Sequence, residues 1–168
     1  VYKRQLVDEL TFGHGVVAES YLPPDHPLYD DDRVAHWPYD PQAARALLEE
    51  IGWTDEDGDG VVEAHGVEGV RRRTPFHVAL LLPSDNPQQE TIARIIRANL
   101  ADCGIQVDLM PVPLQDFLAD GPTGPLLGRQ FDLALFNWFN EVEPPCGLYL
   151  TEQVPGPEDW GRFNISGF

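Results

Sequence analysis

The residues best placed to bind a solute follow an apolar segment near the end of the chain. Residues 131–138 are apolar on both faces and predict a central β-strand, which leads into Asn137, Trp138, Asn140 and Glu141. In parallel sheets, ligands gather where strands end and loops begin. A carboxylate such as that of Glu141 suits a positively charged ligand, and the ring of Trp138 offers an apolar wall whose face attracts a cation. Core packing of Trp138 and a solvated loop position for Glu141 are equally good interpretations.

A second group of acidic residues lies in the middle of the chain. Asp55, Asp57 and Asp59 alternate before a glycine, as in the first half of an EF-hand calcium loop. The second half does not fit, because Gly66 stands where the bidentate Glu belongs and Glu63 comes three residues early. An Asp/Gly turn is therefore favoured, and a calcium-stabilised interaction module is kept as a second hypothesis. The acidic loop comprises Asp55, Glu56, Asp57, Gly58, Asp59 and Gly60.

Other catalytic and metal-binding patterns are missing from the sequence. It has no Gly-x-Ser-x-Gly elbow, no His-Glu-x-x-His and no Gly-rich phosphate loop with Lys. His14, His26 and His36 lack the spacing of a metal site, and two free thiols are favoured over a pair for Cys103 and Cys146. We expect a binding protein with no enzymatic activity, cofactor or metal, and a carboxylate-based hydrolase is the weakest alternative.

A strand–helix–strand unit would position the predicted binding residues. Residues 76–82 predict a strand, and Asn86, Pro87 and Gln89 predict a capped helix start in which the Gln89 side chain reaches back to the cap. Residues 105–110 alternate apolar and polar, as in a strand with one dry face. This parallel crossover should be right-handed. The helix stripe comprises Ile92, Ile95, Ile96, Leu100 and Cys103.

Shorter patterns complete the fold prediction. A helix capped by Asp40 should bury Ala44, Leu47, Leu48 and Ile51. Short helices are also expected near residues 6–10 and 114–118, and a hairpin is expected from residues 61–64 and 67–70. We predict an α/β fold: a mixed sheet with a βαβ crossover core and flanking helices.

Composition limits the partners. The 168 residues carry a net charge of −17, with 28 acidic and 11 basic side chains, which disfavours nucleic acid and anionic membrane surfaces. No apolar run approaches the roughly 20 residues of a spanning helix. With 42% hydrophobic residues, the chain can form one domain, or one lobe of something larger. Because the sequence begins with Val1 and not with an initiator Met, and because its last residues predict loops, we expect a partial domain.

Several short motifs occur in the order found in one protein family. The chain resembles the extracytoplasmic solute-binding proteins of the dipeptide/oligopeptide-binding type, which are the receptors of ATP-driven (ABC, family 5) importers. The matching segments are Arg4–Val7 with Gly13-His14-Gly15, Tyr21–Pro24 with His26-Pro27, Tyr39–Pro41 through Gly52-Trp53, Asp57–Gly60, Phe131-Asp132 through Trp138, and Asn164 with Ser166–Phe168.

The resemblance implies a two-lobed bacterial receptor that closes on a peptide or similar small solute. Residues 1–168 would form most of its second large lobe, without the first lobe, the signal peptide and the last strands. In many relatives, an acidic residue shortly after the Phe-Asp…Trp strand holds the ligand's ammonium group, so the resemblance makes Glu141 and Glu143 the candidates here. His14 and Asn164 are further candidate contacts. The resemblance also implies a monomer in the periplasm or on the cell surface as a lipoprotein, with a membrane permease as partner.

Overall fold

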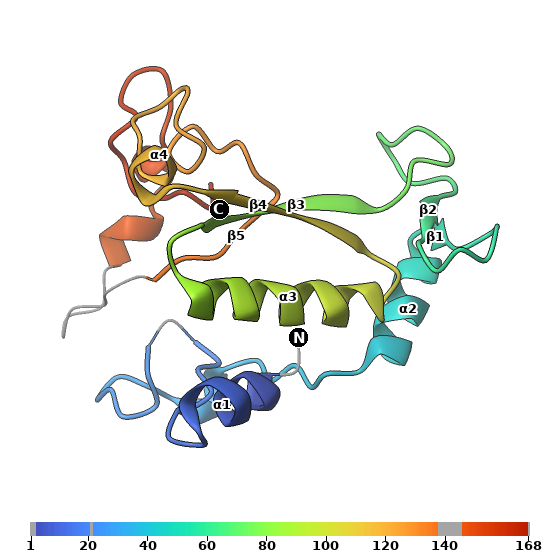
Figure 1. The fold of residues 1–168 in the computed structure, drawn as a ribbon, viewed down its shortest axis with the longest axis horizontal. Helices are drawn as coiled ribbons and strands as arrows, with labels where there is room; N and C mark the ends of the chain where they lie inside the picture. The colour runs from blue at the N-terminus through green and yellow to red at the C-terminus, as the bar shows by residue number, and fades with distance from the viewer. Residues whose placement is uncertain (1–2, 21, 138–145, 168) are drawn as a thin grey trace.

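The centre of the fold is a three-stranded parallel sheet with helix α3 on one face (Figure 1). The computed structural model describes residues 3–20, 22–137 and 146–167. Strand β3 (His77–Pro83) lies between β4 (Gln106–Val112) and β5 (Leu133–Ala134), and α3 (Pro87–Ala101) connects β3 to β4. The predicted α/β class and βαβ core are confirmed, and antiparallel pairing occurs in a separate two-stranded sheet.

The central strand is β3, and the prediction that residues 131–138 form the central strand is wrong. Strand β5 has two residues and pairs through Leu80↔Leu133 and Leu81↔Ala134 at the edge of the sheet. The segment is apolar on both faces because Leu135 packs against the cluster that contains Leu80 and Leu82, whereas Phe136 packs against the cluster that contains Leu81. The apolar residues of this segment therefore reflect packing on both faces of the sheet. They do not indicate that the strand has a hydrogen-bonded neighbour on each side, since β5 pairs with β3 alone in the described residues.

Strand β3 divides the core into two clusters. Leu80 and Leu82 face α3 and pack with Ala93 and Val107. Leu81 faces the other way and is covered by residues after β4. That second cluster comprises Leu81, Phe117, Leu126 and Ile165. Strand β3 is thus buried on both faces from Leu80 to Leu82, as strands of parallel sheets usually are.

Helix α3 begins as predicted, with Asn86 as its cap and Pro87 in the first turn. The predicted reach of the Gln89 side chain back to the cap is wrong, because that side chain donates instead to Asn137. Ala93 is fully buried against the sheet, whereas Ile96 is only half-buried. A small residue at the closest point lets the helix backbone approach the sheet.

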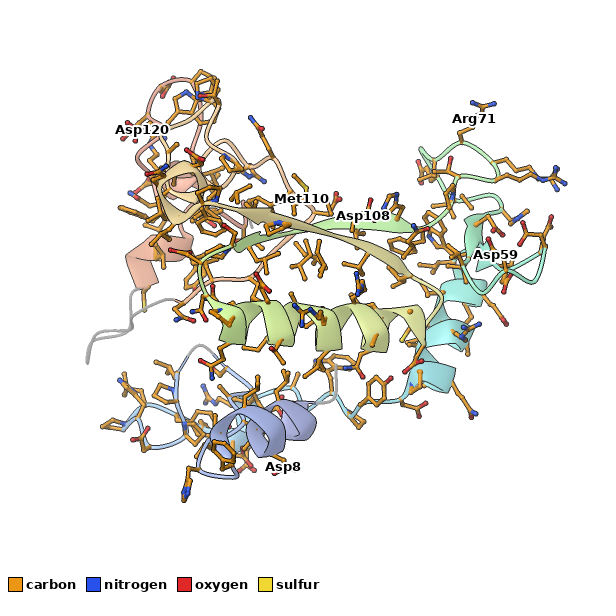
Figure 2. The ribbon with its side chains drawn as sticks, in the orientation of Figure 1. Asp8, Asp59, Arg71, Asp108, Met110 and Asp120 are labelled. Carbon is orange, nitrogen blue, oxygen red and sulfur yellow. The ribbon has the colours of Figure 1, made fainter. Side chains whose placement is uncertain are left out.

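Strand β4 has one dry face, as predicted from its alternation. Val107 is buried and Leu109 packs against the same cluster. Gln106, Asp108 and Met110 are exposed, and Figure 2 shows Asp108 and Met110 on the side of the sheet away from α3.

Helix α2 (Pro41–Glu50) has the predicted cap, since the Asp40 side chain accepts from the N–H of Ala43 at 2.9 Å. Its predicted stripe is only partly correct. Leu48 packs against a third core cluster, which comprises Trp53, Val62 and Ala64, but Leu47 and Ile51 are 60% and 62% exposed. The small sheet has two strands of two residues each, and it covers Leu48 but leaves Leu47 and Ile51 exposed.

The predicted hairpin of residues 61–64 and 67–70 is wrong. Strand β1 (Trp53–Thr54) pairs antiparallel with β2 (Glu63–Ala64), and residues 67–70 form a turn. The buried ring of Trp53 stacks on Phe76 with centroids 4.3 Å apart, which holds this small sheet to the start of β3. The acidic loop is the connection between β1 and β2, and Figure 2 shows Asp59 there.

The amino-terminal segment lies on the face of α3 away from the sheet (Figure 1). Two hydrogen bonds to Asp102 join the α2 region to the end of α3. Tyr39, just before α2, donates to the Asp102 carboxylate at 2.6 Å, and Arg45, in α2, donates to the Asp102 carbonyl at 2.9 Å. None of the helices in the described part of the chain is long and apolar enough to cross a membrane. The other helices are α1 (Lys3–Thr11), α4 (Leu114–Phe117) and the 3-10 turns η1 (Asp31–Arg33), η2 (Cys146–Tyr149) and η3 (Thr151–Gln153).

Candidate functional site

A pocket of about 430 Å³ lies where β3 and β4 end and α3 begins. Figure 1 shows the start of α3 and the ends of β3 and β4 on the same side of the molecule, beside α4. This is the edge at which parallel sheets bind ligands, and the volume is in the range of small-molecule sites. The residues around it are Pro83, Asp85, Asn86, Pro87, Gln89, Leu114, Phe117, Leu118, Phe136 and Asn137. We call it the strand-end pocket.

The first turn of α3 offers the strand-end pocket no free backbone donor. Pro87 has no N–H, and the N–H groups of Gln88 and Gln89 donate to the Asn86 side chain at 3.0 and 3.2 Å. The N–H of Glu90 donates to the Asn86 carbonyl at 3.1 Å. A helix start usually attracts anions through such groups, but here they are already satisfied.

The described lining carries one acid and no base. Asp85 is exposed at the rim, and no Lys, Arg or His is among the lining residues that the structure describes. The remaining polar groups are side-chain amides, and the walls are apolar. Such a lining suits a solute that donates hydrogen bonds or carries positive charge, and it disfavours an anionic group.

Gln89 is the unusual residue of the strand-end pocket. It is 5% exposed, and its Nε2 donates to Oδ1 of Asn137 at 3.2 Å. Its Oε1 is buried and has no hydrogen-bond partner. An unsatisfied buried acceptor costs about 1–3 kcal/mol, so this atom is held in a state that a suitable donor would relieve.

Asn137 lines the strand-end pocket, at the end of the segment that follows β5. Trp138, Asn140, Glu141 and Glu143 lie outside the described residues. In the sequence they lie within six residues after Asn137.

His14 and Asn164 do not line the strand-end pocket in the described structure. His14 is exposed in the turn after α1, where its N–H donates to Thr11. Asn164 is 1% exposed, donates through Nδ2 to the Leu150 carbonyl at 3.1 Å and accepts from Ser166 Oγ at 2.9 Å. It lines a different pocket, of about 550 Å³, beside β5.

Sequence reasoning missed Gln89, Asn86 and Asp85 as site residues. Asn86 and Gln89 were interpreted only as helix-capping residues, although they follow the end of β3 directly. The break at residues 83–87 was the available signal, because a polar loop after a buried strand marks the ligand edge of a parallel sheet.

The acidic loop brings together more carboxylates than its sequence spacing indicates. Oxygens of Asp55, Asp57, Asp59 and Glu63 all lie within 4.8 Å of one another. The Asp55 carboxylate accepts from the N–H groups of Gly58 and Gly60, at 2.7 and 3.0 Å. These bonds hold the turn by themselves, which is the interpretation that the sequence favoured.

The sequence profile of the bacterial extracellular solute-binding proteins, family 5 Middle, matches residues 3–153. Heme-binding protein A of Haemophilus influenzae is 25% identical over 171 residues, which cover 100% of this chain and 27% of that protein. The nickel-binding periplasmic protein of Escherichia coli is 31% identical over 110 residues, or 66% of this chain and 20% of that protein. The chain thus spans about a quarter of the length of these relatives.

Solved structures share the fold. The oligopeptide-binding protein from Thermus thermophilus complexed with a pentapeptide has a TM-score of 0.74 at 22% identity, over 92% of this chain and 25% of that one. The oligopeptide-binding protein AppA from Bacillus subtilis in complex with a nonapeptide has a TM-score of 0.70 at 24% identity, over 86% and 27%.

Proposed function

Because the chain belongs to the family 5 bacterial extracellular solute-binding proteins, we propose that the protein is the substrate-binding component of an ABC importer for a peptide or similar small solute. The family is one of solute-binding proteins and not of enzymes. Relatives are named for heme, nickel, di/tripeptides and dipeptides, so the solute class has to come from the site.

The observation that carries the choice of a peptide is the chemistry of the strand-end pocket. Its described lining offers acceptors and apolar walls, with Asp85 at the rim and an unsatisfied acceptor on Gln89. A peptide presents ammonium and amide donors beside apolar side chains, and the net charge of −17 favours the approach of a cationic end. The described lining has no base to receive the carboxylates of an anionic solute.

In this proposal, residues 1–168 form one wall of the binding cleft, as most of the second lobe of a two-lobed receptor. Glu141 holds the ligand's ammonium group, with Glu143 as its substitute, and Asn137, Trp138 and Asn140 line the same end. His14 is a further proposed contact. Asn164 ranks last, because contact with solute would disturb its bonds to Leu150 and Ser166.

The cellular setting is also a proposal. The family is described as extracellular, and we place this protein in the periplasm or on the cell surface as a lipoprotein. A monomer that delivers its solute to a membrane permease fits a receptor whose binding site closes between two lobes.

Calorimetric titration of the natural protein that carries this sequence tests the solute class. Alanyl-alanine, trialanine, a nickel salt and heme are the probes. We expect saturable heat with at least one of the two peptides. Binding of nickel or heme with no response to either peptide would contradict the peptide proposal and leave the family membership intact.

Calcium binding by the acidic loop is the second candidate function. The approach of four carboxylates within 4.8 Å is the observation in its favour, because hard oxygen ligands suit calcium. The turn remains the favoured interpretation, because the Asp55 carboxylate already accepts from the N–H groups of Gly58 and Gly60.

A further inference from the structure

The buried carboxamide of Gln89 is not explained by the packing of α3. Its residue position is in the first turn of the helix, where the neighbouring Gln88 is exposed. A side chain that served only to cap the helix would turn back toward the backbone N–H of Asn86, since the Asn86 side-chain oxygen serves the N–H groups of Gln88 and Gln89. Gln89 instead points to Asn137 across the pocket end of the sheet.

The pairing with Asn137 fixes the orientation of the amide. Nε2 of Gln89 donates to Asn137 Oδ1 at 3.2 Å, so the donor end is used and the acceptor end is left without a partner. Gln89 lines the strand-end pocket together with Leu118 and Phe136, which are apolar. The chain therefore holds a preoriented acceptor beside an apolar cavity.

The burial of this acceptor indicates which donor fits. An ammonium group next to a neutral amide at 5% exposure would lose its water and gain no opposite charge. A neutral N–H, such as that of a peptide bond, loses less on leaving water and gains a complete hydrogen bond. Asp85, at the exposed rim, is the place for charge.

We propose that Gln89 Oε1 accepts a hydrogen bond from a backbone amide N–H of the solute, and that this bond makes the strand-end pocket selective for amides over esters and other isosteres without that donor. This inference rests on the proposed function and deepens it. Asn137 acts as a positioning residue, because its Oδ1 accepts from Gln89 Nε2 and so holds the Gln89 amide at the end of the strand-end pocket.

A double-mutant cycle between protein and solute tests the bond. The natural protein and its Gln89→Leu variant are titrated with alanyl-alanine, with trialanine, and with the matching depsipeptides in which one amide N–H is replaced by an ester oxygen. We expect the natural protein to bind the amide at least tenfold more tightly than the ester at one position. In Gln89→Leu, amide and ester should bind within about twofold of each other.

Gln88→Leu is the matched control, since it makes the same change on the exposed side of the same helix turn. It should keep the tenfold preference for the amide. Thermal unfolding separates a structural role from a binding role: the Gln89→Leu Tm should be unchanged or higher, because the unsatisfied acceptor is gone.

Each outcome decides something. Equal discrimination between amide and ester in the natural protein and in Gln89→Leu overturns the inference and leaves peptide binding standing. A lower Tm in Gln89→Leu, with amide and ester affinities falling together, assigns Gln89 a structural role and also overturns it. Failure of both peptides to bind the natural protein overturns the proposed solute class, and the inference with it.

Discussion

Replacing Ala93 with leucine tests whether α3 lies as close to the sheet as the structure shows. Ala93 is 0% exposed and packs against Leu80, Leu82 and Val107, which are themselves at most 4% exposed. These three residues sit on strands fixed by the β3–β4 ladder, so a larger side chain has to push the helix away. Overpacking of this kind costs about 1–3 kcal/mol.

Native-state hydrogen exchange of the α3 amides is the suitable assay, because it reports local stability even in a large protein. A loss of about 1–3 kcal/mol in local stability should speed amide exchange roughly 5- to 150-fold. Ala98→Leu is the matched control, since Ala98 is exposed on the same helix, and surface changes of this kind stay within about 0.5 kcal/mol. If the α3 amides exchanged at the same rate in Ala93→Leu and Ala98→Leu, helix α3 would not lie against the sheet at Ala93 as closely as the structure shows.

Three further predictions concern charge and pH. Glu141→Gln should weaken the binding of a cationic peptide at least tenfold in calorimetry with little change in Tm, since losing one partner of a buried charge pair costs about 2–5 kcal/mol. If Glu141→Gln and Glu143→Gln both bound the peptide like the parent, neither carboxylate would hold its ammonium group. The hydrogen bond to Asp102 raises the pKa of Tyr39 from 10.0 to about 12, so the stabilisation from this bond should be complete below pH 10 and be lost as pH rises through 12. Absorbance titration should show a tyrosinate that forms near pH 12 and is missing in Tyr39→Phe. We expect no micromolar calcium heat, because the acidic loop is already capped by its own backbone; heat that vanished in Asp57→Ala would favour calcium binding.

Features governed by neighbours in sequence were predicted correctly. Asp40 and Asn86 each cap a helix because the acceptor and the N–H groups it serves lie within three residues. The single dry face of β4 follows from the alternation of side chains along any strand. The ordered motifs led to the solute-binding family, and the family profile confirms that membership.

Features that depend on partners far apart in the sequence were decided by the tertiary structure. Gln89 had a local hydrogen bond available at the cap, but it pairs with Asn137, which is 48 residues away. Glu63 comes three residues before the Glu position of an EF-hand loop, but the pairing of β1 with β2 brings its carboxylate close to that of Asp55. Residues 131–137 contain only a two-residue edge strand because the β3 ladder sets the pairing. Periodicity shows which faces of a segment avoid water, but the identity of the group that covers each face depends on contacts the chain makes only after it folds.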